Sequence, residues 1–321
     1  TVSFQGGDDL LVLSSTGFND SDTVDGGAGN DSLEIHFNDT VSAEAGAVLP
    51  SGATPNGLDD ASDAVVQAIN NATNVENLIV DVWTQSSEDV DLDASLISNF
   101  TGFVFDDTFR DDLPATGANL ADADIDDVTV TNVRDENTFS FVTDYVDDVV
   151  FTAAAGASVL NVSHIGHDAG NAFGTDWDGI SELEANGFSE FNLELINTDL
   201  DDLATGADET GRNWADLYVE DGSTTTLTGE TGSVDIWVDQ ASASASSANH
   251  NIVFDASALQ TDADRTPGVN NPNAFQNYFS FSGDKVNFSG TQQDDDVWAT
   301  DGADVLNGNG GDDFIVAGEG D

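Results

Sequence analysis

Short runs in which apolar and polar residues alternate recur through the middle of the chain. They are rich in Val, Thr, Phe and Ile and are bounded by Gly, Asn and Asp, which is the pattern of half-buried strands separated by turns. Their irregular spacing favours the coils of a β-solenoid with loops of variable length, and a two-sheet sandwich is the main alternative. The runs cover residues 76–83, 102–105, 127–133, 138–143, 149–152, 158–164, 190–196, 216–219, 233–238, 251–254 and 278–288.

One segment follows a helical period instead. Residues 58–71 place apolar residues at helical spacing after Asp59 or Asp60, either of which can serve as the N-cap, so we expect a short helix packed on the coils. Residues 199–210 are a weaker helix candidate, and the small residues of 241–248 fit either a loop or a flat strand.

A nine-residue pattern occupies both ends of the chain. Residues 26–34 read GGAGNDSLE and fit G-G-x-G-x-D-x-U-x, where U is a large apolar residue, at every constrained position. Residues 4–12 and 17–25 keep the Asp and the apolar position, with four residues inserted between these two copies. Three further copies run in strict phase through 290–316, and another begins at 317. The phased aspartates are Asp9, Asp22, Asp31, Asp295, Asp304 and Asp313.

The chemistry of this pattern points to calcium. Glycines permit a tight turn with positive φ, and the x-U-x tripeptide is a very short strand whose apolar residue points inward. One copy is half a coil, so residues 18 positions apart stack. Aspartate side chains and turn carbonyls of successive coils then face one another and offer the oxygen ligands that Ca²⁺ prefers.

The repeat resembles that of the RTX (repeats-in-toxin) proteins, whose parallel β-roll binds calcium. The resemblance implies several Ca²⁺ ions, held by the six phased aspartates and by backbone carbonyls of Gly7, Gly27, Gly29, Gly302 and Gly311. Residues 290–298 depart from the pattern because Gln292 and Gln293 replace glycines, so that turn is either half-occupied or terminal. We expect the adjacent Asp8, Asp294, Asp296 and Asp312 to be solvated.

These patterns together predict an all-β fold, a right-handed parallel β-solenoid with one short packed helix. We expect RTX β-roll segments at 1–36 and 290–321, the second continuing beyond the chain, and an irregular solenoid or a sandwich at 37–289. The chain has no Met at its start and reads as part of a longer protein. One residue added after Asp321 would restore the nine-residue phase into residues 1–3, so similar units are expected to follow one another in tandem.

Charge restricts the possible partners. The chain has 62 Asp or Glu residues against 5 Lys or Arg, for a net charge of −57. This balance excludes nucleic-acid binding and docking on anionic lipid, and no apolar run is long enough to cross a membrane. So many carboxylates on one fold need cations, which bound calcium or a marine, high-salt setting would supply. Cys is absent, so no disulfide or thiolate site exists.

The sequence gives no sign of an enzyme. It has no HExxH or GxSxG motif, and its five basic residues are scattered. His164 and His167 are read as ordinary polar loop residues rather than a metal pair. The tryptophans either fill the core or form a sugar-stacking face, and they are Trp83, Trp177, Trp214, Trp237 and Trp298.

Residues 74–80 and 180–195 resemble, more loosely, the rung sequences of RTX surface proteins of the S-layer type that leave the cell by type I secretion. We therefore expect an extracellular, calcium-stabilised structural protein of the bacterial surface that assembles with itself into an S-layer or filament. The alternative is an RTX adhesin module that binds polysaccharide, ice or another cell.

Overall fold

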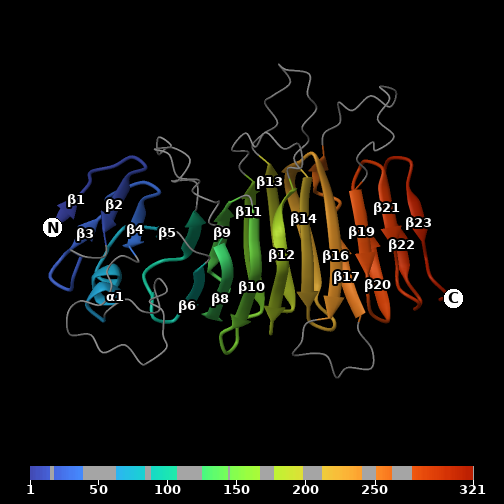
Figure 1. The fold of residues 1–321 in the computed structure, drawn as a ribbon, viewed down its shortest axis with the longest axis horizontal. Coiled ribbons are helices and arrows are strands. Elements are labelled where there is room, and N and C mark those ends of the chain that lie inside the picture. The colour runs from blue at the N-terminus through green and yellow to red at the C-terminus, as the bar shows by residue number, and fades with distance from the viewer. Residues whose placement is uncertain are drawn as a thin grey trace, which may run out of the picture.

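The chain forms a stack of coils with its two termini at opposite ends (Figure 1). The computed structural model describes residues 1–14, 18–38, 63–83, 88–106, 125–143, 145–166, 177–197, 212–240, 251–261 and 277–320. In these ranges every strand pairs in parallel with the equivalent strand of the neighbouring coil, so each coil adds one strand to each of two long sheets.

The first long sheet runs the length of the molecule. In spatial order it contains β2 (Leu10–Ser14), β4 (Ser32–Asn38), β5 (Asn77–Trp83), β7 (Gly102–Asp106), β9 (Thr138–Val142), β11 (Val159–Gly166), β13 (Glu190–Asn197), β15 (Thr224–Thr231), β17 (Asn251–Asp255), β20 (Lys285–Ser289) and β22 (Val305–Asn307), with β18 (Gln260–Thr261) beside β15.

The second long sheet begins at a later coil than the first sheet does, and it ends near the C-terminus. Its order is β6 (Glu88–Asp93), β8 (Ile125–Val133), β10 (Tyr145–Ala153), β12 (Trp177–Asn186), β14 (Arg212–Val219), β16 (Ser233–Gln240), β19 (Asn277–Phe281), β21 (Asp295–Trp298) and β23 (Phe314–Val316). At the N-terminal end, β1 (Val2–Ser3) and β3 (Val24–Asp25) form a short third sheet.

Alternation along each strand builds a continuous core between the sheets. Phe103 and Phe105 of β7 point inward and stack on Phe139 and Phe141 of β9, with ring centroids 5.4 and 5.0 Å apart. These pairs lie in strict register because parallel neighbours repeat the same inward positions from coil to coil. Buried apolar residues from the first coils to the last belong to one cluster.

The parallel β-solenoid predicted from the sequence is therefore confirmed, and the sandwich alternative is wrong because the sheets are built from parallel pairs. The run predicted at 278–288 is wrong as a single strand. A turn at Gly283, whose φ is +124°, divides it into β19 and β20. Strand β6 was not predicted because its sequence, EDVDLD, has only Val90 and Leu92 to bury.

The predicted helix is present as α1 (Asp63–Asn70), which buries Ala68 and Ile69 against the coils. Its expected N-cap, Asp59 or Asp60, lies outside the described residues, as do the segments 199–210 and 241–248. No helix within the described ranges is long and apolar enough to cross a membrane.

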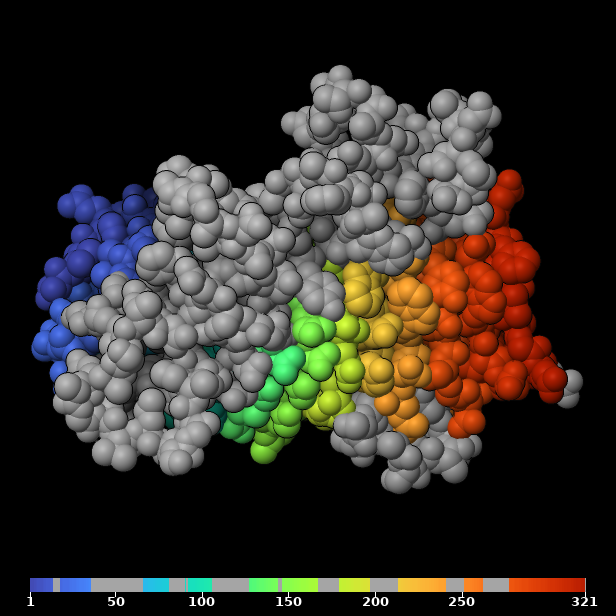
Figure 2. Space-filling model, in the orientation of Figure 1, coloured from blue at the N-terminus to red at the C-terminus, as the bar shows by residue number. Residues whose placement is uncertain are grey.

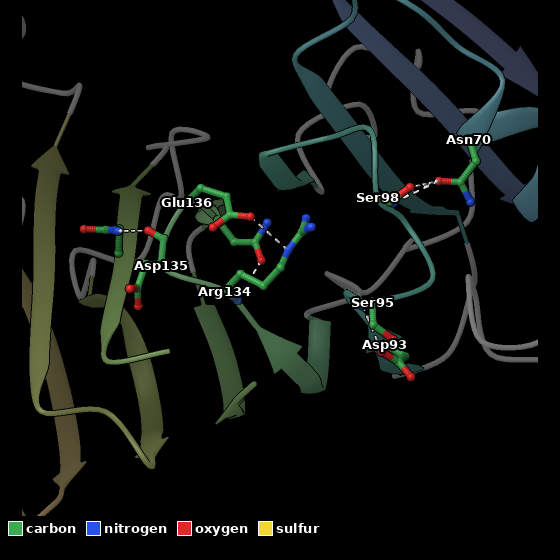
Figure 3. Close-up of polar contacts among 9 residues, drawn as sticks. Asn70, Asp93, Ser95, Ser98, Arg134, Asp135 and Glu136 are labelled. Carbon is green, nitrogen blue, oxygen red and sulfur yellow. Dashed lines mark hydrogen bonds and ion pairs between the residues drawn. The ribbon is translucent and has the colours of Figure 1, made fainter. Parts of the chain in front are cut away.

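Polar side chains outside the strands also connect neighbouring parts of the stack (Figure 3). One oxygen of Asp135 accepts the backbone N–H groups of Ser158 and Val159, at 2.6 and 2.9 Å. The side-chain oxygen of Asn70 accepts the N–H of Ser98 at 2.9 Å. Each contact satisfies a backbone N–H at the start of a strand or in a turn, so these side chains join successive coils without any ligand from outside the chain.

His164 corrects one expectation. It lies inside strand β11, facing the core with 1% of its surface exposed, and is not a polar loop residue. Its Nδ1 lies 3.1 Å from the side-chain nitrogen of Asn213, whose oxygen in turn accepts the hydroxyl of Thr231 at 2.6 Å. His167 lies outside the described residues.

Candidate calcium sites

The terminal coils stack with the spacing that the nonapeptide predicts. Strand β23 pairs with β21, and β22 with β20, with partners 18 residues apart. At the N-terminal end β4 pairs with β2 at a separation of 22, because four residues are inserted between the copies. The β20–β22 pairing also shows that residues 281–289 form a further half-coil in the same phase, in which Val286 takes the place of the aspartate.

In three copies the aspartate at the sixth position reaches back to the coil before it. One oxygen of Asp31 accepts the backbone N–H of Asp9 at 2.9 Å. The same contact joins Asp304 to the N–H of Val286 at 2.8 Å and Asp313 to the N–H of Asp295 at 3.2 Å. The aspartates therefore occupy one repeated position between stacked turns.

Glycine at the first position of a copy makes room for that aspartate. A Cβ on Gly26 would lie 2.6 Å from the second oxygen of Asp31. On Gly290 and Gly308 a Cβ would likewise run into the carboxylates of Asp295 and Asp313. The first glycine of the motif is thus required by the space that the carboxylate takes, in addition to the turn itself.

Backbone carbonyls of one turn point at the turn stacked above it. A Cβ on Gly29 would overlap the carbonyl oxygen of Gly7, and one on Gly302 that of Asp284. Gly7, Gly27, Gly29 and Gly311 have positive φ, as expected of turn glycines, whereas Gly302 does not. Turn carbonyls and carboxylates therefore face the gap between successive coils, as an oxygen-ligated cation requires.

Two of the carboxylates have an oxygen for which the protein supplies no partner. The second oxygens of Asp31 and Asp304 are buried and accept no hydrogen bond. Asp31 itself is only 1% exposed. A buried anionic oxygen without a partner is costly, and a divalent cation would relieve that cost. These residues fit Ca²⁺. Among the described residues no three acidic or histidine side chains converge by themselves, so backbone carbonyls must complete each ligand shell.

Asp295 is satisfied differently. Its carboxylate accepts the N–H and the hydroxyl of Thr291, both at 2.8 Å, and the side-chain amide of Asn277 at 3.1 Å. Burial raises the pKa of Asp295 to about 6, although these hydrogen bonds oppose the rise. In this copy, which lacks the inner glycines, protein donors occupy both oxygens.

The remaining predicted positions lie at the margins of the stacks. Asp9 belongs to the first coil of its column, and Asp22 accepts the N–H of Asn19 within its own turn at 3.1 Å. Asp8 and Asp294 are exposed as expected. Each also accepts a backbone N–H from the next coil, that of Asn30 at 2.9 Å and of Asp312 at 2.7 Å respectively.

Glu76 is a site residue that sequence reasoning missed. Its carboxylate accepts the N–H of Asp31 at 2.9 Å, which is the contact that Asp31 makes to Asp9 one coil earlier. Strand β5 pairs with β4 from Asn77 onward, so Glu76 occupies the sixth position of a third stacked coil. The sequence feature that could have identified Glu76 is ENL at 76–78, in which an acid lies two residues before a buried Leu. The periodicity is hidden because Glu76 is 45 residues away from Asp31.

These observations define a parallel β-solenoid whose terminal coils carry glycine–aspartate turns suited to calcium. Residues 16–34 and 289–321 match the family model of the RTX calcium-binding nonapeptide repeat (4 copies). The chain therefore carries RTX calcium-binding nonapeptide repeats, and these repeats bind Ca²⁺. No curated protein and no solved structure matches it.

Proposed function

We propose that this chain is a secreted, calcium-stabilised structural protein of the bacterial surface that assembles with itself into an S-layer or filament. RTX repeat proteins are typically extracellular and exported by type I secretion, which supports this location. A non-enzymatic role is part of the proposal, in keeping with a family that is generally structural or toxin-associated.

Calcium binding and folding are coupled in this proposal. Asp31 and Asp304 are the principal ligands because each holds a buried oxygen without a protein partner. Asp9, Asp22 and Asp313 are the further carboxylate ligands, joined by the carbonyls of Gly7, Gly27, Gly29, Gly302 and Gly311. Asp295 is not among them, because both of its oxygens accept hydrogen bonds from the protein. An ion between two coils cancels repulsion and closes the turns, so its binding free energy adds directly to folding.

The stacking of one repeated coil on the next is the observation that supports self-assembly. The first strand of the long sheet exposes Leu10 by 54%, and the last coil exposes Val305 by 54% and Phe314 by 55%. A strand edge with exposed apolar side chains is a template for another strand. The first and last described coils follow the same nonapeptide, so a coil of one unit can stack on a coil of another unit as successive coils do within the chain. Such a head-to-tail contact, repeated, generates a filament.

The test is assembly as a function of calcium, followed by sedimentation velocity and electron microscopy on the purified chain. We expect monomers in EGTA and filaments or sheets in millimolar calcium. Leu10→Lys and Val305→Lys should stop assembly while leaving the calcium-dependent circular dichroism spectrum unchanged. Val253→Lys, an equally drastic change at an exposed valine in the middle of the stack, is the matched control and should still assemble. A chain that folds with calcium yet stays monomeric at all concentrations would refute the proposal.

The adhesin alternative is supported by a separate observation. Trp237, Tyr278 and Trp298 form neighbouring ring contacts on strands of the second long sheet. A module of this kind would bind a ligand along the side of the stack and would not need the ends.

A further inference from the structure

The outer face of the second long sheet combines aromatic rings with carboxylates. In β14 the core receives Ala215 and Leu217, so Trp214, Asp216 and Tyr218 point outward. In β16 the core receives Val234, Ile236 and Val238, so Trp237 and Asp239 point outward. Register places Asp216 beside Trp237 and Tyr218 beside Asp239. Rings and acids therefore alternate along and across the two strands.

Four of these side chains line a cleft. Trp214, Asp216, Trp237 and Asp239 surround a cavity of about 300 Å³ that opens on the outer face. Both indoles are partly exposed. A cavity of this size, with apolar walls and a few convergent polar groups, is at the lower end of the range of small-ligand sites.

The carboxylates give the cleft a definite charge preference. The pKa of Asp216 is raised, first by burial and then by the negative charge of Asp239. Two acids that repel each other between indole rings favour a positively charged guest, because a cation is attracted both by the carboxylates and by the faces of the rings.

The aromatic surface continues from the cleft along the stack. The ring of Trp237 lies 5.4 Å from that of Tyr278, Tyr278 lies 4.7 Å from Trp298, and Trp298 lies 5.9 Å from Phe314. These residues come from β16, β19, β21 and β23, one per coil. The part of the chain that contains them is coloured orange to red in Figure 2. Four coils at ~4.8 Å per strand give a track of roughly 15 Å beside the cleft.

We propose that this face binds an oligosaccharide that contains amino sugars, with a protonated amine in the cleft between Trp214 and Trp237 and the sugar rings along the aromatic track. The amine pairs with Asp216 and Asp239. The apolar face of a pyranose ring suits aromatic side chains, and the ring-to-ring spacing of the track is comparable to the length of one sugar unit. A ligand with both a cation and a flat apolar body uses both parts of the surface.

The experiment compares three sugar oligomers of matched length by isothermal titration calorimetry on the full chain at fixed calcium. These are a glucosamine oligomer, its N-acetylated counterpart and a glucose oligomer, and a lysine oligomer is the fourth ligand. We expect the glucosamine oligomer to bind at least tenfold more tightly than both neutral sugars and than the lysine oligomer.

Variants separate the two parts of the site. Asp216→Asn and Asp239→Asn keep the side-chain shape and should weaken glucosamine binding about tenfold while leaving the weak binding of neutral sugars unchanged. Trp237→Ala should weaken the binding of all three sugar oligomers. Glu194→Gln removes one charge from the outer face of the other long sheet and is the matched control, expected to bind as the unaltered chain does.

Three results would overturn the proposal: equal affinity for charged and neutral sugars, unchanged glucosamine binding in both Asp→Asn variants, or a lysine oligomer that binds as tightly as the glucosamine oligomer. The measurement does not depend on self-assembly. Sugar binding by a chain that forms no filament would reject the structural role alone, and filaments that bind no amino sugar would reject this site alone.

Discussion

The carboxylate of Asp31 accepts the backbone N–H of Asp9, 22 residues earlier, on one oxygen and keeps its other oxygen buried without a partner in the protein. One side chain thus links two coils and leaves an anionic atom for a ligand from outside the chain. One carboxylate oxygen therefore holds the backbone of the neighbouring coil, and the other oxygen is left to bind the metal.

Asp31→Asn should lower stability only where calcium is present. The amide oxygen can still accept the N–H of Asp9, whereas the second carboxylate oxygen is lost as a ligand. Loss of one site filled at 100 times its dissociation constant removes about 2.7 kcal/mol. Thermal unfolding by circular dichroism across a calcium titration measures this. Asp20→Asn, at an exposed turn residue, is the control. An equal loss in EGTA and in calcium would show that Asp31 is not a ligand.

Gly26→Ala should destabilise the N-terminal coils with or without calcium. The new methyl group would lie 2.6 Å from a carboxylate oxygen of Asp31 and would overlap the carbonyl oxygen of Asn74, so the turn must open. Forced crowding of this kind costs about 1–3 kcal/mol. Gly6→Ala meets only the carbonyl of Ala28 at 3.3 Å and is the comparison. Hydrogen exchange of the Asp9 amide reports the opening directly, and unchanged protection in Gly26→Ala would contradict this account.

Thr291→Val should weaken the C-terminal coils equally in calcium and in EGTA. The hydroxyl of Thr291 donates to Asp295 at 2.8 Å and accepts the N–H of Gln293 at 3.1 Å, so its removal leaves a buried carboxylate short of a donor. The expected cost is about 1–3 kcal/mol. Thr291→Ser retains the hydroxyl and should keep most of the stability. A loss that appears only with calcium would instead identify Asp295 as a metal ligand.

His164 should make the fold less stable as the pH falls from about 6.5 towards 4. Burial lowers the pKa of His164 from 6.5 to about 4, so between these values the unfolded chain binds a proton that the folded chain refuses. The free energy of unfolding therefore falls through that window, by up to ~3 kcal/mol at the acid end. His164→Gln can still accept the amide of Asn213 and does not titrate.

The difference between the two chains in urea unfolding at pH 4 to 7 isolates this effect, because protonation of the acidic surface is common to both. A difference that stays constant with pH would show that His164 is not the group responsible.

The nonapeptide coils were predictable because glycine and aspartate each meet a local requirement. Gly26 gives space to Asp31, and the aspartates within each block are nine residues apart except for Asp9 and Asp22. The half-coil at 281–289 was not predicted because Val286 replaces the acid, and Glu76 was not predicted because its partner Asp31 is 45 residues away. Val286 and Glu76 are aligned with the aspartates of neighbouring coils by the register between strands, and that register cannot be read from the sequence.

The strands of the middle coils were predictable, but the polar residues buried between them were not. The alternation in β11 that buries Leu160 and Val162 also buries His164, yet a histidine two residues before a glycine resembles the start of a loop. Its partner Asn213, and Thr231 which donates to Asn213, come from other coils, and no local sequence feature indicates them. The same holds for the cleft between Trp214 and Trp237, which depends on the pairing of β14 with β16.

The termini lie at opposite ends of the stack, and each described strand of the long sheets pairs with strands of the adjacent coils, so the response of the chain to a pulling force can be inferred (Figure 1). A load that draws the termini apart would peel one coil at a time instead of breaking the whole molecule at once. Each released coil lengthens the chain and dissipates work before the next begins to yield. A cell-surface material made of such units would stretch stepwise under shear and recover as coils re-form.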